Sequence, residues 1–178
     1  YEYGGTAITY NPATRSLFMV GHDWDQFVGE ISIPALGGTA AVIQALRDPL
    51  EGKMGQINPG DPNSKKIGGM LVYGGKLVIS AYSYYDGQGS QVLSHFSRPL
   101  TLATTGQVVG PVRVGPLGAG FYSGYMAPVP AALQSQLGEP PHGSTGIGEL
   151  FCVVLAADAQ HLPNLRQRYT SARAWTGE

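Results

Sequence analysis

The sequence is poor in cysteine and in charge, and each shortage excludes a class of protein. Cys152 is the only cysteine among 178 residues, so neither an intrachain disulfide nor a cysteine-based zinc site can form. Charged residues make up 13% of the chain and the formal net charge is -1. A nucleic-acid-binding protein would show a basic patch or stripe instead, so no nucleic-acid partner is expected.

Long apolar runs are absent as well. No run approaches the ~18 apolar residues that a membrane-spanning helix needs, so no membrane partner is expected. No charged segment followed by an apolar one begins at Tyr1, so the sequence shows no signal peptide.

Several catalytic motifs are missing. There is no Gly-x-Ser-x-Gly elbow, which argues against an α/β-hydrolase, and no phosphate-binding loop of an NTPase. The four histidines are scattered at positions 22, 95, 142 and 161, and they form neither His-x-His-x-Asp-His nor His-Glu-x-x-His. A dinuclear zinc lactonase or a zinc protease is therefore not expected.

Glycine, proline and tyrosine are abundant instead, with 26, 13 and 10 residues. Many short strands joined by tight turns produce such a composition. Residues 4–34 contain three strand-like segments, at 6–10, 16–20 and 27–33, and residues 39–46 predict a fourth, although their alanines would equally allow a short helix. A long polar loop, residues 48–66, follows; loops of this length are usually functional or mobile.

The same pattern then restarts. Strand-like segments at residues 68–73, 76–81, 91–98 and 108–114 repeat the order of the first four, and a third start lies at residues 118–127. Four short antiparallel strands over roughly 45–65 residues are typical of a propeller blade. We therefore predict an all-β fold of propeller-like four-stranded blades, with about 2.5–3 blades in the chain. The alternative is a β-sandwich whose hairpins merely look alike.

A propeller needs about four to eight blades to close, so we expect a second chain to complete the ring, as a homodimer. Residues 1–137 are predicted to form the blades. Residues 138–178 diverge from the repeat, with one buried-type strand at 149–156 and a possible short helix at 158–168.

Oxygen-bearing side chains supply the candidate site. Calcium prefers six to eight oxygen ligands from carboxylates, amides and carbonyls on loops. The candidate Ca²⁺ ligands fall in three loops: Asp23 and Asp25, then Asn58, Asp61 and Asn63, then Asp86. A bound Ca²⁺ would polarise a substrate carbonyl, with His22 or Asp23 as the catalytic base. Such an arrangement matches calcium-dependent propeller lactonases by analogy of fold.

Structural interpretations stand beside these. Asp and Asn in glycine-rich turns often bond only their own backbone. Glu30 is either a surface residue or a buried partner of an arginine, His95 is expected to be a strand side chain, and Lys65 and Lys66 are expected to end a solvated loop. The tyrosines at positions 82, 84 and 85 either pack or stack on a ligand.

Blocks reading YGGTA, VGHDW, NPGDPNSKKIGG and YSYYDG resemble an uncharacterised family of larger exported bacterial proteins, over residues 3–127. The resemblance implies a secreted or periplasmic protein and an activity that opens the lactone ring of N-acyl-homoserine lactones, which is quorum quenching. The chain departs from the family after about Gly138, as a changed reading frame or a truncation would make it do. Three hypotheses follow: a Ca²⁺-dependent lactonase, a non-enzymatic module that binds a glycan or a protein, and a truncated chain that folds only as an oligomer.

Overall fold

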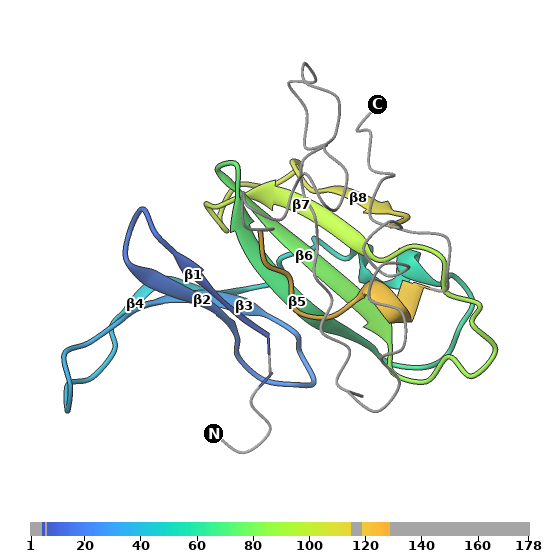
Figure 1. Ribbon diagram of the computed structural model, residues 1–178, viewed down its shortest axis with the longest axis horizontal. Helices are drawn as coiled ribbons and strands as arrows, with labels where there is room; N and C mark the ends of the chain where they lie inside the picture. The colour runs from blue at the N-terminus through green and yellow to red at the C-terminus, as the bar shows by residue number, and fades with distance from the viewer. Residues whose placement is uncertain (1–4, 6, 115–118, 129–178) are drawn as a thin grey trace, which may run out of the picture.

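The computed structural model describes residues 5, 7–114 and 119–128. This part of the chain is all-β and contains two four-stranded antiparallel sheets that lie beside each other (Figure 1). In each sheet the strands are hydrogen-bonded in their order along the chain. The predicted all-β fold and the two four-stranded units are therefore confirmed.

The first sheet consists of β1 (Ile8–Asn11), β2 (Ser16–Val20), β3 (Val28–Ser32) and β4 (Val42–Arg47). Burial alternates along β2, because successive side chains of a strand point to opposite faces. The uncertain fourth segment is a strand and not a helix, and it forms one edge of the sheet.

The second sheet consists of β5 (Lys65–Tyr73), β6 (Lys76–Ser83), β7 (His95–Pro99) and β8 (Val109–Val112). The tight turn between β5 and β6 is made by two glycines with positive φ, 55° and 73°. Positive φ at both central residues is typical of a two-residue hairpin turn whose twist matches that of the strands, and glycine adopts it without steric cost. The 3-10 helix η1 (Lys53–Ile57) lies in the long loop before β5.

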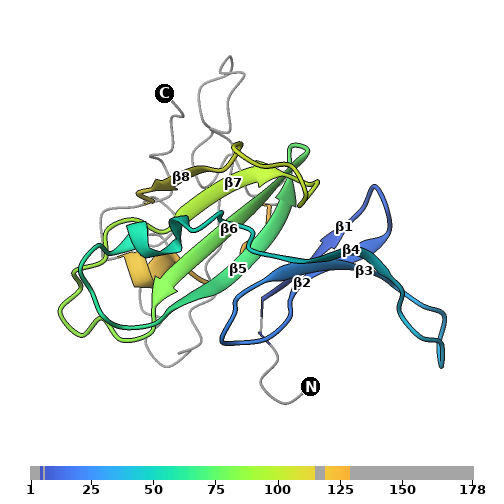
Figure 2. The same ribbon diagram turned by 180° about the vertical axis from the view of Figure 1, so that it is seen from behind.

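One core joins the two sheets, which Figure 2 shows from behind. In this core, buried side chains of β2 and β3 pack with buried side chains of β5, β6 and β7. The main contributors are Phe18, Val20 and Val28 from the first sheet and Met70, Leu77, Ile79 and Phe96 from the second.

The predicted third repeat is wrong for the residues that the structure describes. Residues 119–128 contain the 3-10 helix η2 (Ala119–Tyr122) and no strand. The segment instead crosses the second sheet, where a Cβ on Gly68 would lie 1.5 Å from the carbonyl oxygen of Ser123. Ser80 also donates a hydrogen bond to the carbonyl of Gly124 at 3.0 Å. The backbone therefore lies so close to β5 that only glycine fits there. The predicted boundary at 137/138 and residues 138–178 lie outside the described residues.

Glu30 is buried in the first sheet, but its partners are neutral side chains and not an arginine. Its carboxylate accepts hydrogen bonds from Asn11, Thr14, Ser16 and, at 2.6 Å, the amide of Gln44. Burial raises the pKa of Glu30, but these four bonds outweigh that effect and leave the pKa below its ordinary value.

Gln44 extends this network to the second sheet. Its amide nitrogen also donates to the carbonyl of Leu100 at 3.0 Å, and its amide oxygen accepts from the backbone nitrogen of Leu102 at 2.7 Å. The edge strand β4 is thus bonded to the loop that follows β7.

Arg98 is the largest fully buried side chain, with 1% of its surface exposed. Among the described residues no carboxylate is hydrogen-bonded to its guanidinium; five backbone carbonyls are, at 2.8–3.3 Å. The acceptors are Pro49, Pro99, Thr101, Leu102 and Thr104. One side chain therefore holds the loop before η1 and the loop after β7 together.

Candidate functional site

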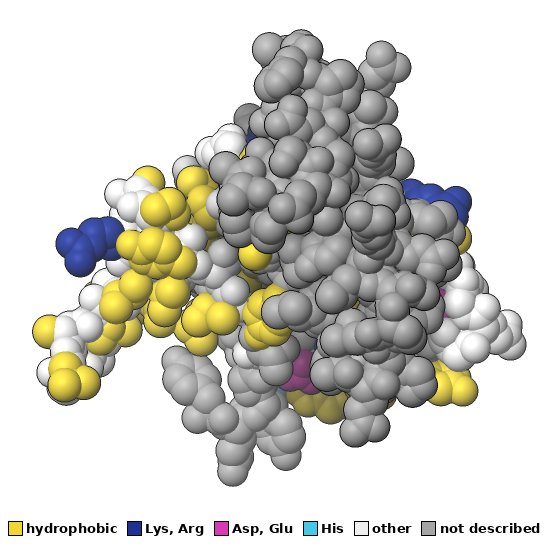
Figure 3. All heavy atoms as spheres, viewed as in Figure 1, with side chains coloured by type: hydrophobic (Ala, Val, Ile, Leu, Met, Phe, Trp, Pro, Cys, Tyr) yellow, Lys and Arg dark blue, Asp and Glu magenta, His cyan; other side chains and the backbone are white. Residues whose placement is uncertain are grey.

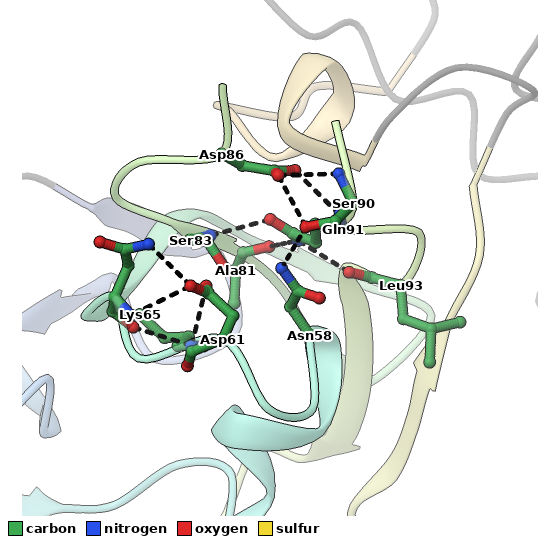
Figure 4. A network of polar contacts seen from close by, with 10 residues as sticks. Asn58, Asp61, Lys65, Ala81, Ser83, Asp86, Ser90, Gln91 and Leu93 are labelled. Atoms are coloured by element: carbon green, nitrogen blue, oxygen red, sulfur yellow. Dashed lines mark hydrogen bonds and ion pairs between the residues drawn. The ribbon is translucent and has the colours of Figure 1, made fainter. Parts of the chain in front are cut away.

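A polar pocket lies where the loop between η1 and β5 meets the loop between β6 and β7. Its volume is about 390 Å³, which is in the range of pockets that take small molecules. The polar side chains lining it include Asn58, Asp61, Asn63, Tyr85, Asp86 and Ser90. Figure 4 shows the hydrogen bonds that hold its two sides.

Asp61 stabilises the turn that forms the first side of the pocket. Its carboxylate accepts hydrogen bonds from the backbone and the side-chain nitrogens of Asn63, at 3.0 and 2.7 Å, and pairs with the ammonium of Lys65 at 3.0 Å. The backbone bond from Asn63, followed by the bond from Lys65, lowers the pKa of Asp61 far below its ordinary value. The carboxylate is therefore ionised at any physiological pH.

Asp86 holds the second side. It accepts from the backbone and the hydroxyl of Ser90, at 2.7 and 2.8 Å, and from the backbone of Gln91 at 2.9 Å. Burial raises the pKa of Asp86, but these bonds outweigh it and the pKa lies below its ordinary value. The amide of Asn58 donates to the Ser90 hydroxyl at 2.9 Å and so links the two sides of the pocket.

Gln91 is a supporting residue that the sequence did not reveal. It is fully buried; its side chain accepts from the backbone of Ser83 at 2.8 Å and donates to the carbonyls of Ala81 and Leu93 at 3.0 and 2.7 Å. The β6–β7 loop is thereby fixed to the end of β6, as Figure 4 shows. The sequence signal, a glutamine after a glycine-rich turn, is common to many loops.

The structure brings together four of the six predicted metal ligands, namely Asn58, Asp61, Asn63 and Asp86. The amide nitrogens of Asn58 and Asn63 are used in hydrogen bonds, so their oxygens are the remaining acceptors. Two ionised carboxylates and two amide oxygens form a hard donor set of the kind Ca²⁺ prefers. Within the described residues, no three His, Cys, Asp or Glu side chains form a metal-binding group.

The other predicted site residues, His22, Asp23 and Asp25, lie in the loop between β2 and β3 and do not line this pocket. Asp23 forms an ion pair with Lys66 at 2.5 Å. The same ammonium lies 5.5 Å from the ring centre of Trp24, a cation–π contact. The ring nitrogen Nδ1 of His22 accepts from the backbone of Trp24 at 3.2 Å.

Lys65 and Lys66 are not a solvated loop end, as the sequence had suggested; they begin β5. Because consecutive strand residues point to opposite faces, Lys65 reaches Asp61 and Lys66 reaches Asp23. The cluster that contains Asp23 therefore lies on the other side of the start of β5 from the two clusters that share the pocket.

His95 lies within β7, as predicted, and it is buried. Burial lowers its pKa to about 4, because the charged imidazolium is poorly solvated there. Its Nδ1 is hydrogen-bonded to the hydroxyl of Ser94 at 2.7 Å. The imidazole is therefore neutral at pH 7 and is part of the sheet.

Among the described residues, no helix has the length and apolar character to cross a membrane. Comparison of the chain with protein-family models, with curated proteins and with solved structures found no match. Function therefore has to be inferred from the pocket and its chemistry.

Proposed function

We propose that this chain is a lactonase that opens the ring of N-acyl-homoserine lactones or similar small lactones at the polar pocket. The observation that carries the proposal is the convergence of Asn58, Asp61, Asn63 and Asp86, from two separate loops, on one pocket of about 390 Å³. Four oxygen-bearing side chains selected as ligands from the sequence thus share a cavity of small-molecule size. The resemblance to the exported bacterial family supplies the substrate class.

The pocket offers two ionised carboxylates to a lactone and a water molecule. Asp86 is aligned by Ser90 and Gln91, so its remaining lone pairs have a fixed direction and can accept a proton from an attacking water. Water adds to the carbonyl carbon as its proton passes to Asp86, the ring C–O bond breaks, and the ring oxygen takes up that proton from Asp86 to give the hydroxy acid. The phenol of Tyr85, 69% exposed at the rim, offers an apolar surface for an acyl chain.

Calcium fits this donor set. The carboxylates of Asp61 and Asp86 and the amide oxygens of Asn58 and Asn63 would hold it. When bound, Ca²⁺ supplies Lewis-acid polarisation of the lactone carbonyl. Because Lys65 already neutralises part of the charge on Asp61, we expect weak binding, with a dissociation constant on the order of 10⁻⁴–10⁻³ M.

The experiment measures ring opening of a short-chain N-acyl-homoserine lactone with and without EDTA and added Ca²⁺. We expect Asp86→Asn to reduce kcat/KM at least ~100-fold, whereas the matched change Asp25→Asn, outside the pocket, leaves it unchanged. Loss of activity in Asp23→Ala with an unaffected Asp86→Asn would move the chemistry to the β2–β3 loop and refute the pocket. A wild-type protein without turnover in Ca²⁺ would refute the lactonase.

A second candidate function is favoured by the tyrosines of the same loop. Tyr84 and Tyr85 are 71% and 69% exposed beside the polar pocket, and exposed aromatic rings next to carboxylates and amides suit a glycan. This candidate predicts binding to a glycan array without turnover, lost in Tyr85→Ala and kept in Tyr10→Ala, a matched change on the first sheet. Turnover of lactones with no glycan retained would exclude it.

The propeller-like arrangement, the homodimer and the secreted or periplasmic location belong to the same proposal. Two four-stranded sheets of equal strand order that share one core are consistent with successive blades. Millimolar calcium outside the cytoplasm would suit a weak site. Detection of the protein in the periplasmic or culture fraction of a native producer tests the location.

A further inference from the structure

A second cluster of aromatic and charged side chains lies at the start of β5, on the side opposite to the polar pocket. Lys66 of β5 pairs with Tyr82 of β6, so both side chains are on this side of the sheet. The ammonium of Lys66 bonds the carboxylate of Asp23 at 2.5 Å and its carbonyl at 2.8 Å. It also lies 5.5 Å from the ring centre of Trp24. We call these four residues, together with Tyr84, the aromatic platform.

Tyr84 belongs to the same side of the sheet. The pairing of β5 with β6 continues one residue beyond the strands, where the backbone nitrogen of Tyr84 donates to the carbonyl of Ser64 at 2.8 Å. Because side chains alternate along a strand, Tyr84 points to the side of Tyr82, whereas Tyr85 lines the pocket. Burial raises the pKa of Tyr82, and its interactions with Asp23 and Tyr84 raise it further. These three groups are therefore neighbours.

The loop that carries Trp24 is fixed to β5. Gln26, in the same loop, is buried, and its amide oxygen accepts from the backbone nitrogen of Ile67 at 2.6 Å. Its amide nitrogen donates to the carbonyl of Asp23 at 2.5 Å. Together with the bonds from Lys66, these contacts hold the loop in place before any ligand arrives. A ligand that binds here therefore has little ordering of the protein to offset.

Two rings of the aromatic platform are open to solvent. Trp24 is 75% exposed and Tyr84 is 71% exposed, although tryptophan side chains are highly buried on average. The exposed hydrophobic side chains seen in Figure 3 gather instead over the strands of the first sheet. Trp24 is flanked in the chain by Asp23 and the exposed Asp25, and its ring lies next to the Lys66 ammonium. It is thus an apolar ring among charged groups and not part of a broad apolar patch.

We propose that the aromatic platform binds a neutral carbohydrate, whose pyranose rings stack on Trp24 and Tyr84. A pyranose with equatorial hydroxyls has an apolar face of axial C–H groups and a polar rim, which suits an exposed aromatic ring beside hydrogen-bonding groups. The side chain of Asp23 is 45% exposed, so its carboxylate can accept a hydrogen bond from a sugar hydroxyl. An acidic sugar would be repelled, because Asp23 and Asp25 together outweigh the single positive charge of Lys66.

This site is separate from the polar pocket and does not rest on lactonase activity. It also differs from the glycan candidate at Tyr85, because that ring lines the pocket on the other side of β5. Changes at Trp24 should therefore leave lactone turnover as it is in wild type, and Asp86→Asn should leave carbohydrate binding as it is. The two proposals can fail independently of each other.

The test is isothermal titration calorimetry of the full chain with cellohexaose, a neutral β-1,4-linked probe, and with the matching β-1,4-linked hexaglucuronate, which is acidic. We expect wild type to bind cellohexaose and not the acidic probe. Trp24→Ala should weaken cellohexaose binding at least ~10-fold, whereas Trp24→Phe, which keeps a ring, should retain most of it. Tyr84→Ala should weaken binding by about 3–10-fold. Tyr85→Ala, on the pocket side, is the matched control and should bind like wild type.

Circular dichroism establishes that each variant is folded, and fluorescence gives a second measurement. Cellohexaose should change the tryptophan emission of wild type but not that of Trp24→Phe, which retains only Trp175. No binding of cellohexaose by wild type up to about 10 mM, or unchanged binding in Trp24→Ala, would overturn the proposal. Binding lost in Tyr85→Ala but kept in Trp24→Ala would place the sugar on the pocket side and overturn it as well. If wild type binds no sugar, and sedimentation velocity shows self-association that Trp24→Ala abolishes, the platform is a protein contact and the proposal is wrong.

Discussion

Arg98 provides the sharpest test of how this fold is held. Arg98 is 1% exposed, and its guanidinium donates to five backbone carbonyls, one of them at the end of β7 and the others in two loops. A hydrogen bond to a charged group contributes ~1.5–3 kcal/mol, and a buried carbonyl left without a donor costs ~1–3 kcal/mol. Because such terms are not additive, we expect Arg98→Met to lower the free energy of unfolding by about 3–5 kcal/mol.

The assay is urea denaturation followed by circular dichroism, with wild type, Arg98→Met, Arg98→Lys and Arg47→Met compared. Arg98→Lys keeps the charge but has three donors in place of five, so we expect a loss of about 2–3 kcal/mol. Arg47 is exposed on β4, and its change to methionine should stay within about 0.5 kcal/mol of wild type. An Arg98→Met protein within ~1 kcal/mol of wild type would refute the reasoning, since the five bonds would then contribute almost nothing net.

Three further predictions concern other buried contacts. Burial lowers the pKa of His95 in the folded protein to about 4 from 6.5, so between these pH values the unfolded chain binds a proton that the folded protein does not. The free energy of unfolding should therefore fall as the pH drops from 6.5 to about 4. Urea denaturation at several pH values should show a weaker dependence of this free energy on pH in His95→Gln. Gly68→Ala should destabilise the folded protein by at least ~2 kcal/mol, because the added Cβ would overlap the Ser123 carbonyl. Gly55→Ala is the control and should have little effect, since there is open space around Gly55. Equal melting temperatures of the two variants would refute the close contact at Gly68. Gln91→Ala should cost about 1–3 kcal/mol and raise amide exchange in the β6–β7 loop, and unchanged exchange would show that its three hydrogen bonds do not fix the loop.

The strands were predictable because their signals are local. Alternating burial along β2 and the paired glycines between β5 and β6 are encoded within a few residues. The conformation of residues 119–128, which form no strand, could not be predicted from such local signals. Their glycine and tyrosine content matches the start of a repeat, and only the tertiary contact with Gly68 shows that they cover a sheet.

The candidate site was predicted as residue types and not as an arrangement. Asp61 and Asp86 stood out as oxygen ligands in turns, but their shared pocket depends on two loops that come together only in the folded chain. Lys66 explains why Asp23 is separate: it holds that carboxylate on the opposite side of β5. The partners of Arg98 are backbone carbonyls, which every sequence has, so no residue pattern marks them.

The bonds made by Gln44 have a consequence for the order of folding. This residue of β4 reaches the backbone of Leu102, 58 positions later in the chain. During synthesis β4 can pair with β3, but the bonds from Gln44 to Leu100 and Leu102 form only after the loop beyond β7 has left the ribosome. Contacts so distant in sequence slow folding and lengthen the exposure of apolar strands.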